Sequence, residues 1–152
     1  MKKAVVLVIL GCGLLLPSCS PSLSVPPKAH PKVGPWQDLF APDLSNATYP
    51  AGIWTFEDGI LTASEDKAIW TQKDYDNFVV DLEFKTADGT NSGVIVYCSD
   101  TGNWIPNSVE IQIADDFAKK WAESPKTWQC AAVFGHLAAK KSMVMRTEQC
   151  RQ

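Results

Sequence analysis

A carboxylate and an amide that could do chemistry together stand at alternate positions of the stretch VEIQI, residues 109–113. The remaining positions of this stretch are aliphatic, so a strand of period two would bury them and present Glu110 and Gln112 on its opposite face. A carboxylate can act as a general base, and an amide can donate and accept hydrogen bonds. The pattern predicts a polar site here, with Glu110 as the candidate base, although a solvated strand carboxylate would give the same pattern.

A second group suited to proton transfer is His136, in the segment FGHLAA. The unperturbed pKa of histidine lies near neutrality, so this side chain could serve as an acid or as a second base. A structural histidine in a turn is the competing interpretation.

The strands that must position these groups can be read from the pattern. The run GVIVYC, residues 93–98, is apolar on both alternating faces, which is typical of a central strand. Further strands are expected at 36–40, in a hairpin of IWTFE and ILTAS around Asp58 and Gly59, at 68–71, and in FVVDLEFKT.

One short helix is expected in ADDFAKKWAES, with Asp115 as its N-cap rather than as a metal or sugar ligand. No helix in the pattern is long enough to cross between parallel strands. The fold class is therefore an all-β sandwich of jelly-roll type.

The N-terminus has the layout of a secretory signal: Lys2 and Lys3, then an apolar run too short for a comfortable membrane span, then small residues. Residues 1–18 are interpreted as a signal peptide, and Cys19 as a lipidated first residue, with ordinary cleavage as the alternative. Residues 19–35 are Pro-rich and read as a tether. We expect an exported protein, periplasmic or a lipoprotein of the cell envelope, that meets the membrane only through this anchor.

The composition of the chain limits the kinds of partner and cofactor that it is expected to bind. The chain has 152 residues, six tryptophans and a formal net charge of −3, which suits one domain with a real core and disfavours a nucleic-acid partner. No cysteine or histidine spacing indicates a zinc site, and the acidic residues show no converging set, so no metal and no cofactor are assigned. A disulfide between Cys98 and Cys130 and two free thiols are both compatible with the sequence.

Several motifs in order resemble the 3-keto-disaccharide hydrolase domain family: WQDLF, WTFEDGILTA, DNFVVDLEFKT, TNSGVIVYC, NSVEIQIAD and CAAVFGHLAAKKS. The resemblance covers residues 36–144. It implies a concanavalin-like jelly roll and action on glycosides that carry a ketone at carbon 3. Such a ketone acidifies the proton on carbon 2, so a base can remove it while the leaving group departs from carbon 1.

With this chemistry, the resemblance favours Glu110 and His136 as catalytic residues, and a carbohydrate as the partner. Gln112 is suited to sugar hydroxyls, and Asn91 and Ser92 either contact ligand or cap backbone groups. Trp104 and Trp128 lie in polar loops, where an indole could stack on a pyranose ring or pack at the rim.

Some residues depart from the family pattern. Ala131, Phe134 and Ala139 stand where glycine, tyrosine and proline are common, and residues 145–152 lack strand alternation. The sandwich is therefore expected to be incomplete, through truncation or a change of reading frame. Two other functions stay open: a noncatalytic lectin-like module and an inactive truncated fragment.

Overall fold

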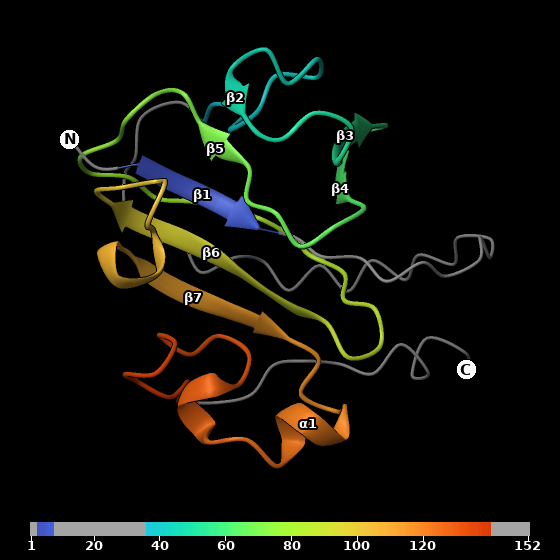
Figure 1. Cartoon of the computed structure of the whole chain (residues 1–152), viewed down its shortest axis with the longest axis vertical. Coiled ribbons are helices and arrows are strands. Elements are labelled where there is room, and N and C mark those ends of the chain that lie inside the picture. Colours follow the sequence, from blue (N-terminus) through green and yellow to red (C-terminus); the bar gives the residue numbers. More distant parts are fainter. Residues whose placement is uncertain (1–2, 8–35, 141–152) are drawn as a thin grey trace.

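The computed structural model describes residues 3–7 and 36–140, and the regular elements of this part are mostly strands, with one short α-helix (Figure 1). The all-β class expected from the sequence is confirmed. The predicted tether, Cys19 and residues 145–152 lie outside the described residues, as does most of the predicted signal peptide. No helix among the residues that can be described is long and apolar enough to cross a membrane.

The central sheet is antiparallel and has the order β1-β6-β7. These strands are β1 (Lys3–Leu7), β6 (Asn91–Cys98) and β7 (Val109–Ala114). β6 lies in the middle, as its run of apolar residues predicts, and Ile95 at its centre is fully buried. Part of the segment interpreted as a signal peptide thus forms β1, which lies between β5 and β6 (Figure 1).

Two smaller antiparallel pairs flank this sheet. The predicted hairpin is present as β3 (Trp54–Glu57) and β4 (Ile60–Ala63). Its turn residues, Asp58 and Gly59, have φ of 51° and 78°, which are the left-handed values that a two-residue hairpin turn requires. The second pair joins β2 (Ala47–Thr48) to β5 (Trp70–Thr71). A core cluster under the β3–β4 hairpin contains Phe40, Leu44, Ala47, Trp54, Ala63 and Ile69.

Two predicted strands are not assigned. Residues 36–40 are irregular, although Phe40 is buried. Residues 78–86 keep the predicted alternation, with Phe78, Val80 and Leu82 partly buried, but form no strand. Alternation reports which side chains are covered, whereas a strand also needs a backbone partner that the local sequence does not encode.

The predicted helix is α1 (Lys119–Ala122), and it begins later than the sequence analysis expects. Its N-cap is Ala118, with no side-chain cap, so the assignment of Asp115 as helix cap is wrong. Asp115 Oδ2 instead accepts a hydrogen bond from Gly89 N at 2.9 Å, and Oδ1 accepts one from Phe117 N at 3.1 Å. Two 3₁₀ turns complete the described helical structure, η1 (Ile105–Asn107) and η2 (Lys126–Trp128).

Candidate active site

The register of β6 and β7 sorts their side chains onto two faces. Ile95 pairs with Glu110 and Gly93 pairs with Gln112, whereas Val94 pairs with Ile111. Directly opposed residues of an antiparallel pair share a face, and faces alternate along each strand. We call the face with Glu110 and Gln112 the polar face, and it also carries Asn91, Gly93 and Ile95.

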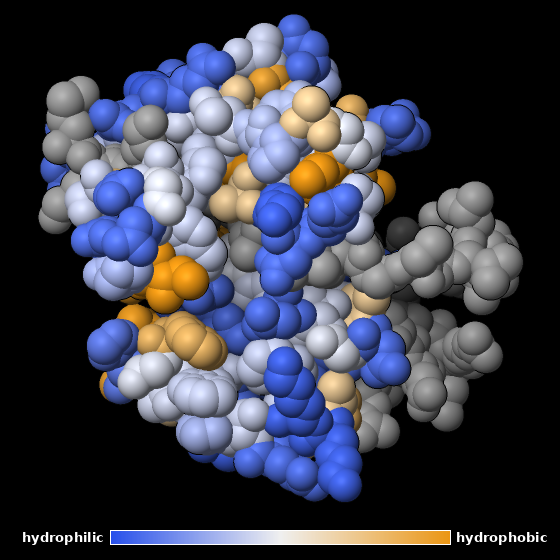
Figure 2. Space-filling model, viewed as in Figure 1, coloured by the Kyte–Doolittle hydropathy of each residue, from blue (hydrophilic) through white to orange (hydrophobic). Residues whose placement is uncertain are grey.

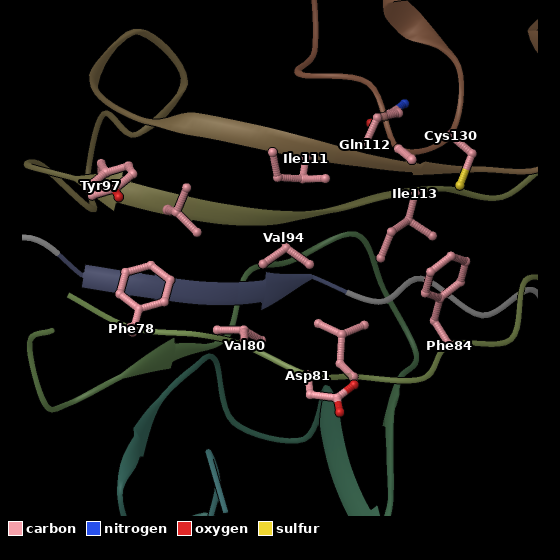
Figure 3. A pocket seen from close by; sticks show the side chains of 13 residues that line it. Phe78, Val80, Asp81, Phe84, Val94, Tyr97, Ile111, Gln112, Ile113 and Cys130 are labelled. Atoms are coloured by element: carbon pink, nitrogen blue, oxygen red, sulfur yellow. The ribbon is translucent and has the colours of Figure 1, made fainter. Parts of the chain in front are cut away.

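The opposite face bounds an apolar cavity of about 500 Å³. Val94, Ile111 and Ile113 point into it from the sheet, and Phe78, Val80 and Phe84 point into it from the segment that crosses below (Figure 3). Gln112 also borders this cavity, but its side chain projects away from the apolar cluster (Figure 3). A lining of this kind offers few groups that could bind sugar hydroxyls, so the cavity is distinct from the polar site.

Ser92 belongs to the face of the apolar cavity, because it pairs with Ile113. Its side chain is 1% exposed, and its Oγ has no hydrogen-bond partner among the described residues. Ser92 and Glu110 therefore lie on opposite faces of the sheet, although the sequence predicted both of them at the site.

Glu110 is partly buried on the polar face, and its carboxylate lies across the backbone of Gly93. Burial raises the pKa of this carboxyl above its ordinary value, and the negative charge of Asp66 raises the pKa further. Both effects disfavour the charged form, so the ionised Glu110 is a stronger base than a solvated glutamate.

Gln112 lies beside Glu110 but is only 1% exposed, so it is less open than the alternation suggests. Its Nε2 donates a hydrogen bond to Asn91 Oδ1 at 3.1 Å. This bond leaves Gln112 Oε1 without a partner among the described residues and turns Asn91 Nδ2 into an available donor. Asn91 itself is exposed at the start of β6. The pair therefore supplies a fixed acceptor and an outward donor.

The start of β6 is held by the segment that follows β7. Asp115 N donates to Thr90 O at 3.1 Å, and Asp115 Oδ2 accepts from Gly89 N. Trp121 on α1 is buried and donates from Nε1 to Gly89 O at 3.3 Å. Asp115 thus acts on the site by fixing the turn that places Asn91.

The two tryptophans expected at the site lie in different surroundings. Trp104 packs against the buried cluster of Trp70, Ile95 and Cys98. Trp128 is 43% exposed and stacks on Phe134, with ring centroids 5.6 Å apart.

Phe134 N donates to Glu110 O at 3.0 Å, so this aromatic pair belongs to the segment that borders β7. The sequence analysis missed Phe134 as part of the site, noting it only as a departure from the family pattern. It also missed Gly93 and Asp66.

His136 is exposed in a tight turn, where its backbone N donates to Val133 O at 2.9 Å. The same turn borders Glu110 through Phe134. The imidazole is therefore exposed to solvent on a turn whose backbone borders β7.

Within residues 3–7 and 36–140, no three His, Cys, Asp or Glu side chains converge as a metal site would require. Cys98 and Cys130 are both buried, and they do not form a disulfide with each other. Cys98 belongs to the cluster with Ile95, whereas Cys130 lines the apolar cavity across the sheet. Burial raises the pKa of the Cys130 thiol.

The fold and this site define an all-β domain with a partly buried carboxylate beside a fixed amide pair. The chain belongs to the 3-keto-alpha-glucoside-1,2-lyase-like domain family, whose model matches residues 35–149. Its sequence is also 50% identical to that of a protein from Parabacteroides distasonis ATCC 8503, whose crystal structure is described as that of a candidate glycosyl hydrolase. The two structures superpose with a TM-score of 0.71. That match covers 74% of this chain but only 57% of the other. No curated protein matches this chain.

Proposed function

We propose that this domain cleaves 3-keto-glycosides, with Glu110 as the base that removes the proton from carbon 2. The observation that carries the proposal is the environment of Glu110, which is partly buried next to Asp66 and has a raised pKa. A general base works best when its pKa lies close to the working pH, and burial moves a carboxyl in that direction. Membership of the family supplies the class of substrate.

The reaction would proceed by elimination followed by addition of water. Glu110 takes the proton from carbon 2, and the electron pair of that bond is delocalised onto the ketone oxygen at carbon 3. Collapse of this enolate forms the double bond between carbons 1 and 2 and breaks the bond from carbon 1 to the leaving oxygen. That oxygen takes up a proton, and water then adds across the double bond to give the free 3-keto sugar.

The neighbours of Glu110 can support these steps. Asn91 Nδ2 is available to donate to the enolate oxygen, because Asn91 Oδ1 is engaged by Gln112. Preorganised donors aimed at a developing charge stabilise it without reorganisation. Gln112 is buried, so in this proposal it orients Asn91 through their hydrogen bond and does not contact the sugar itself. His136, exposed in the bordering turn, is assigned to protonate the leaving oxygen.

The test compares the purified full chain with Glu110→Gln and His136→Ala on a 3-keto-disaccharide, with the unoxidised disaccharide as the substrate control. Loss of a positioned base reduces turnover by about 10²- to 10⁴-fold, and both variants should still unfold in a single cooperative thermal transition. Unchanged turnover in either folded variant would reject the role of that residue.

A noncatalytic carbohydrate-binding module is the second candidate, favoured by the exposed Trp128, which stacks on the partly buried Phe134. An aromatic face of this kind can bind a sugar ring without any chemistry. Calorimetric binding of the 3-keto-disaccharide by a wild type that does not turn it over would favour this function.

Export completes the proposal and rests on the sequence of the N-terminus, with Lys2 and Lys3 before an apolar run that leads to Cys19. A lipidated Cys19 would place the domain at the cell envelope, and the cleavage that makes Cys19 the first residue would remove β1 (Lys3–Leu7) from the mature protein. Phase partitioning of the cell-derived protein into detergent should succeed for the wild type and fail for Cys19→Ala. A wild-type protein found only in the aqueous phase would contradict the anchor.

A further inference from the structure

The backbone conformation of β6 does not require a glycine at position 93. The strand runs from Asn91 to Cys98, and Gly93 does not have the positive φ that other side chains avoid. Glycine in the middle of a strand is destabilising relative to alanine, because glycine loses more conformational freedom on folding. Its presence therefore needs a reason other than backbone conformation.

The space above Gly93 is filled by the side chain of Glu110. A Cβ atom at position 93 would lie 2.7 Å from Glu110 Cγ and 2.9 Å from Cδ, and it would also collide with Oε1. Nothing else is among the nearest atoms, so the carboxylate occupies the volume that any other residue would need.

Two neighbouring positions on the polar face are already filled. Ile95, directly across the ladder, is fully buried and packs in a cluster with Trp70 and Cys98. Gln112, on the same strand, is held by its hydrogen bond to Asn91. The carboxylate therefore reaches diagonally toward the empty position over β6.

We propose that Gly93 is the positioning residue of this site: the missing side chain creates the notch in which Glu110 is held beside Gln112. This inference rests on the proposed function for its catalytic consequence, but the placement of Glu110 can be tested without any substrate. Alanine at position 93 would fit the strand backbone and would turn the flexible end of Glu110 out toward solvent.

The experiment uses the full chain and the variant Gly93→Ala. Its control is Gly102→Ala, since a Cβ at Gly102 meets only Asp100 Oδ1 at 3.4 Å, an ordinary contact. Carbon-13 NMR of labelled glutamate side chains follows the titration of Glu110, which Glu110→Gln assigns by its missing signal. The same proteins are assayed on the 3-keto-disaccharide.

We expect the titration midpoint of Glu110 to move to lower pH in Gly93→Ala, and turnover to fall at least tenfold. Gly102→Ala should change neither quantity. An unchanged midpoint in Gly93→Ala overturns the inference. A wild type that does not turn over the sugar overturns the proposed function instead, while the comparison of midpoints still decides the role of Gly93.

A double variant covers the case in which Gly93→Ala does not fold. If the collision is with Glu110, alanine at position 93 should be tolerated once Glu110→Ala has removed that side chain. Thermal unfolding of Glu110→Ala with and without Gly93→Ala measures this. A loss of stability that persists in the double variant would mean that Gly93 accommodates something other than Glu110, and the inference would fail.

Discussion

Replacing Glu110 with glutamine should remove activity and at the same time stabilise the protein at neutral pH. Glutamine has nearly the same size and shape, so the notch over Gly93 stays filled. The ionised carboxylate, by contrast, is held in a partly buried place beside Asp66, which raises its pKa in the folded state. Burying this charge lowers the free energy of unfolding, and the uncharged amide of glutamine carries no such penalty.

The sign follows from proton binding. Between the ordinary pKa of Glu110 and its raised value in the folded protein, the folded state binds more protons than the unfolded state, so stability falls as pH rises. Below the ordinary pKa, near 4.5, the penalty is absent, and above the folded pKa it is complete. Each unit by which the pKa is raised corresponds to about 1.4 kcal/mol. For a domain of this size that is a difference in Tm of roughly 4–6 °C.

The assay is thermal unfolding of the wild type and Glu110→Gln from pH 4 to pH 8, with Glu83→Gln as a control for loss of an exposed charge. The advantage of Glu110→Gln should grow with pH and then level off, whereas Glu83→Gln should show no such growth. An advantage that is the same at every pH, or a loss of stability at neutral pH, would refute the environment assigned to Glu110.

Two further predictions concern the aromatic pair and the central sheet. Trp128→Ala should raise KM for the 3-keto-disaccharide several-fold with little change in kcat. Ile60 is exposed on the β3–β4 hairpin, and the control variant Ile60→Ala should change neither constant. A fall in kcat alone in Trp128→Ala would contradict a binding role for Trp128. Val5→Pro in the full chain should speed hydrogen exchange of the backbone amide of Ile95, which pairs with Val5 across the β1–β6 ladder. Proline lacks the backbone N–H donor and disrupts the pairing of the two strands. Unchanged exchange would mean that β1 does not protect β6 in solution.

Much of the site could be predicted because it lies on one regular strand pair. The alternation around Glu110 and Gln112 placed both on one face, and the apolar run of β6 predicted its central position. Gly93 was available as a signal too, since a glycine inside a strand indicates close approach of another group. Which group approaches depends on the register with β7, and that is a long-range property.

Other features depended on partners that the local sequence does not name. Residues 78–86 alternate like a strand but have no assigned ladder, and Asp115 caps the turn at Gly89 rather than the helix that follows it. Ser92 was grouped with Asn91 as a neighbour in sequence, although adjacent strand residues face opposite ways. The contribution of Asp66 to the pKa of Glu110 comes from a loop that is distant in sequence.

The hydropathy of the surface does not reveal the site. The face drawn in Figure 2 is largely hydrophilic, with apolar spots scattered across it. Single exposed apolar side chains are ordinary in folded proteins. The candidate site is therefore recognised from the environment of Glu110 and not from the character of the surface.

Release of monosaccharide from a 3-keto-disaccharide deuterated at carbon 2 tests the central claim most directly. If Glu110 removes that proton, the wild type should release sugar more slowly from the deuterated substrate than from the protiated one, Glu110→Gln should release almost none, and the unoxidised disaccharide should be inert. Equal rates from the oxidised and unoxidised sugars, or full activity in Glu110→Gln, would contradict the account.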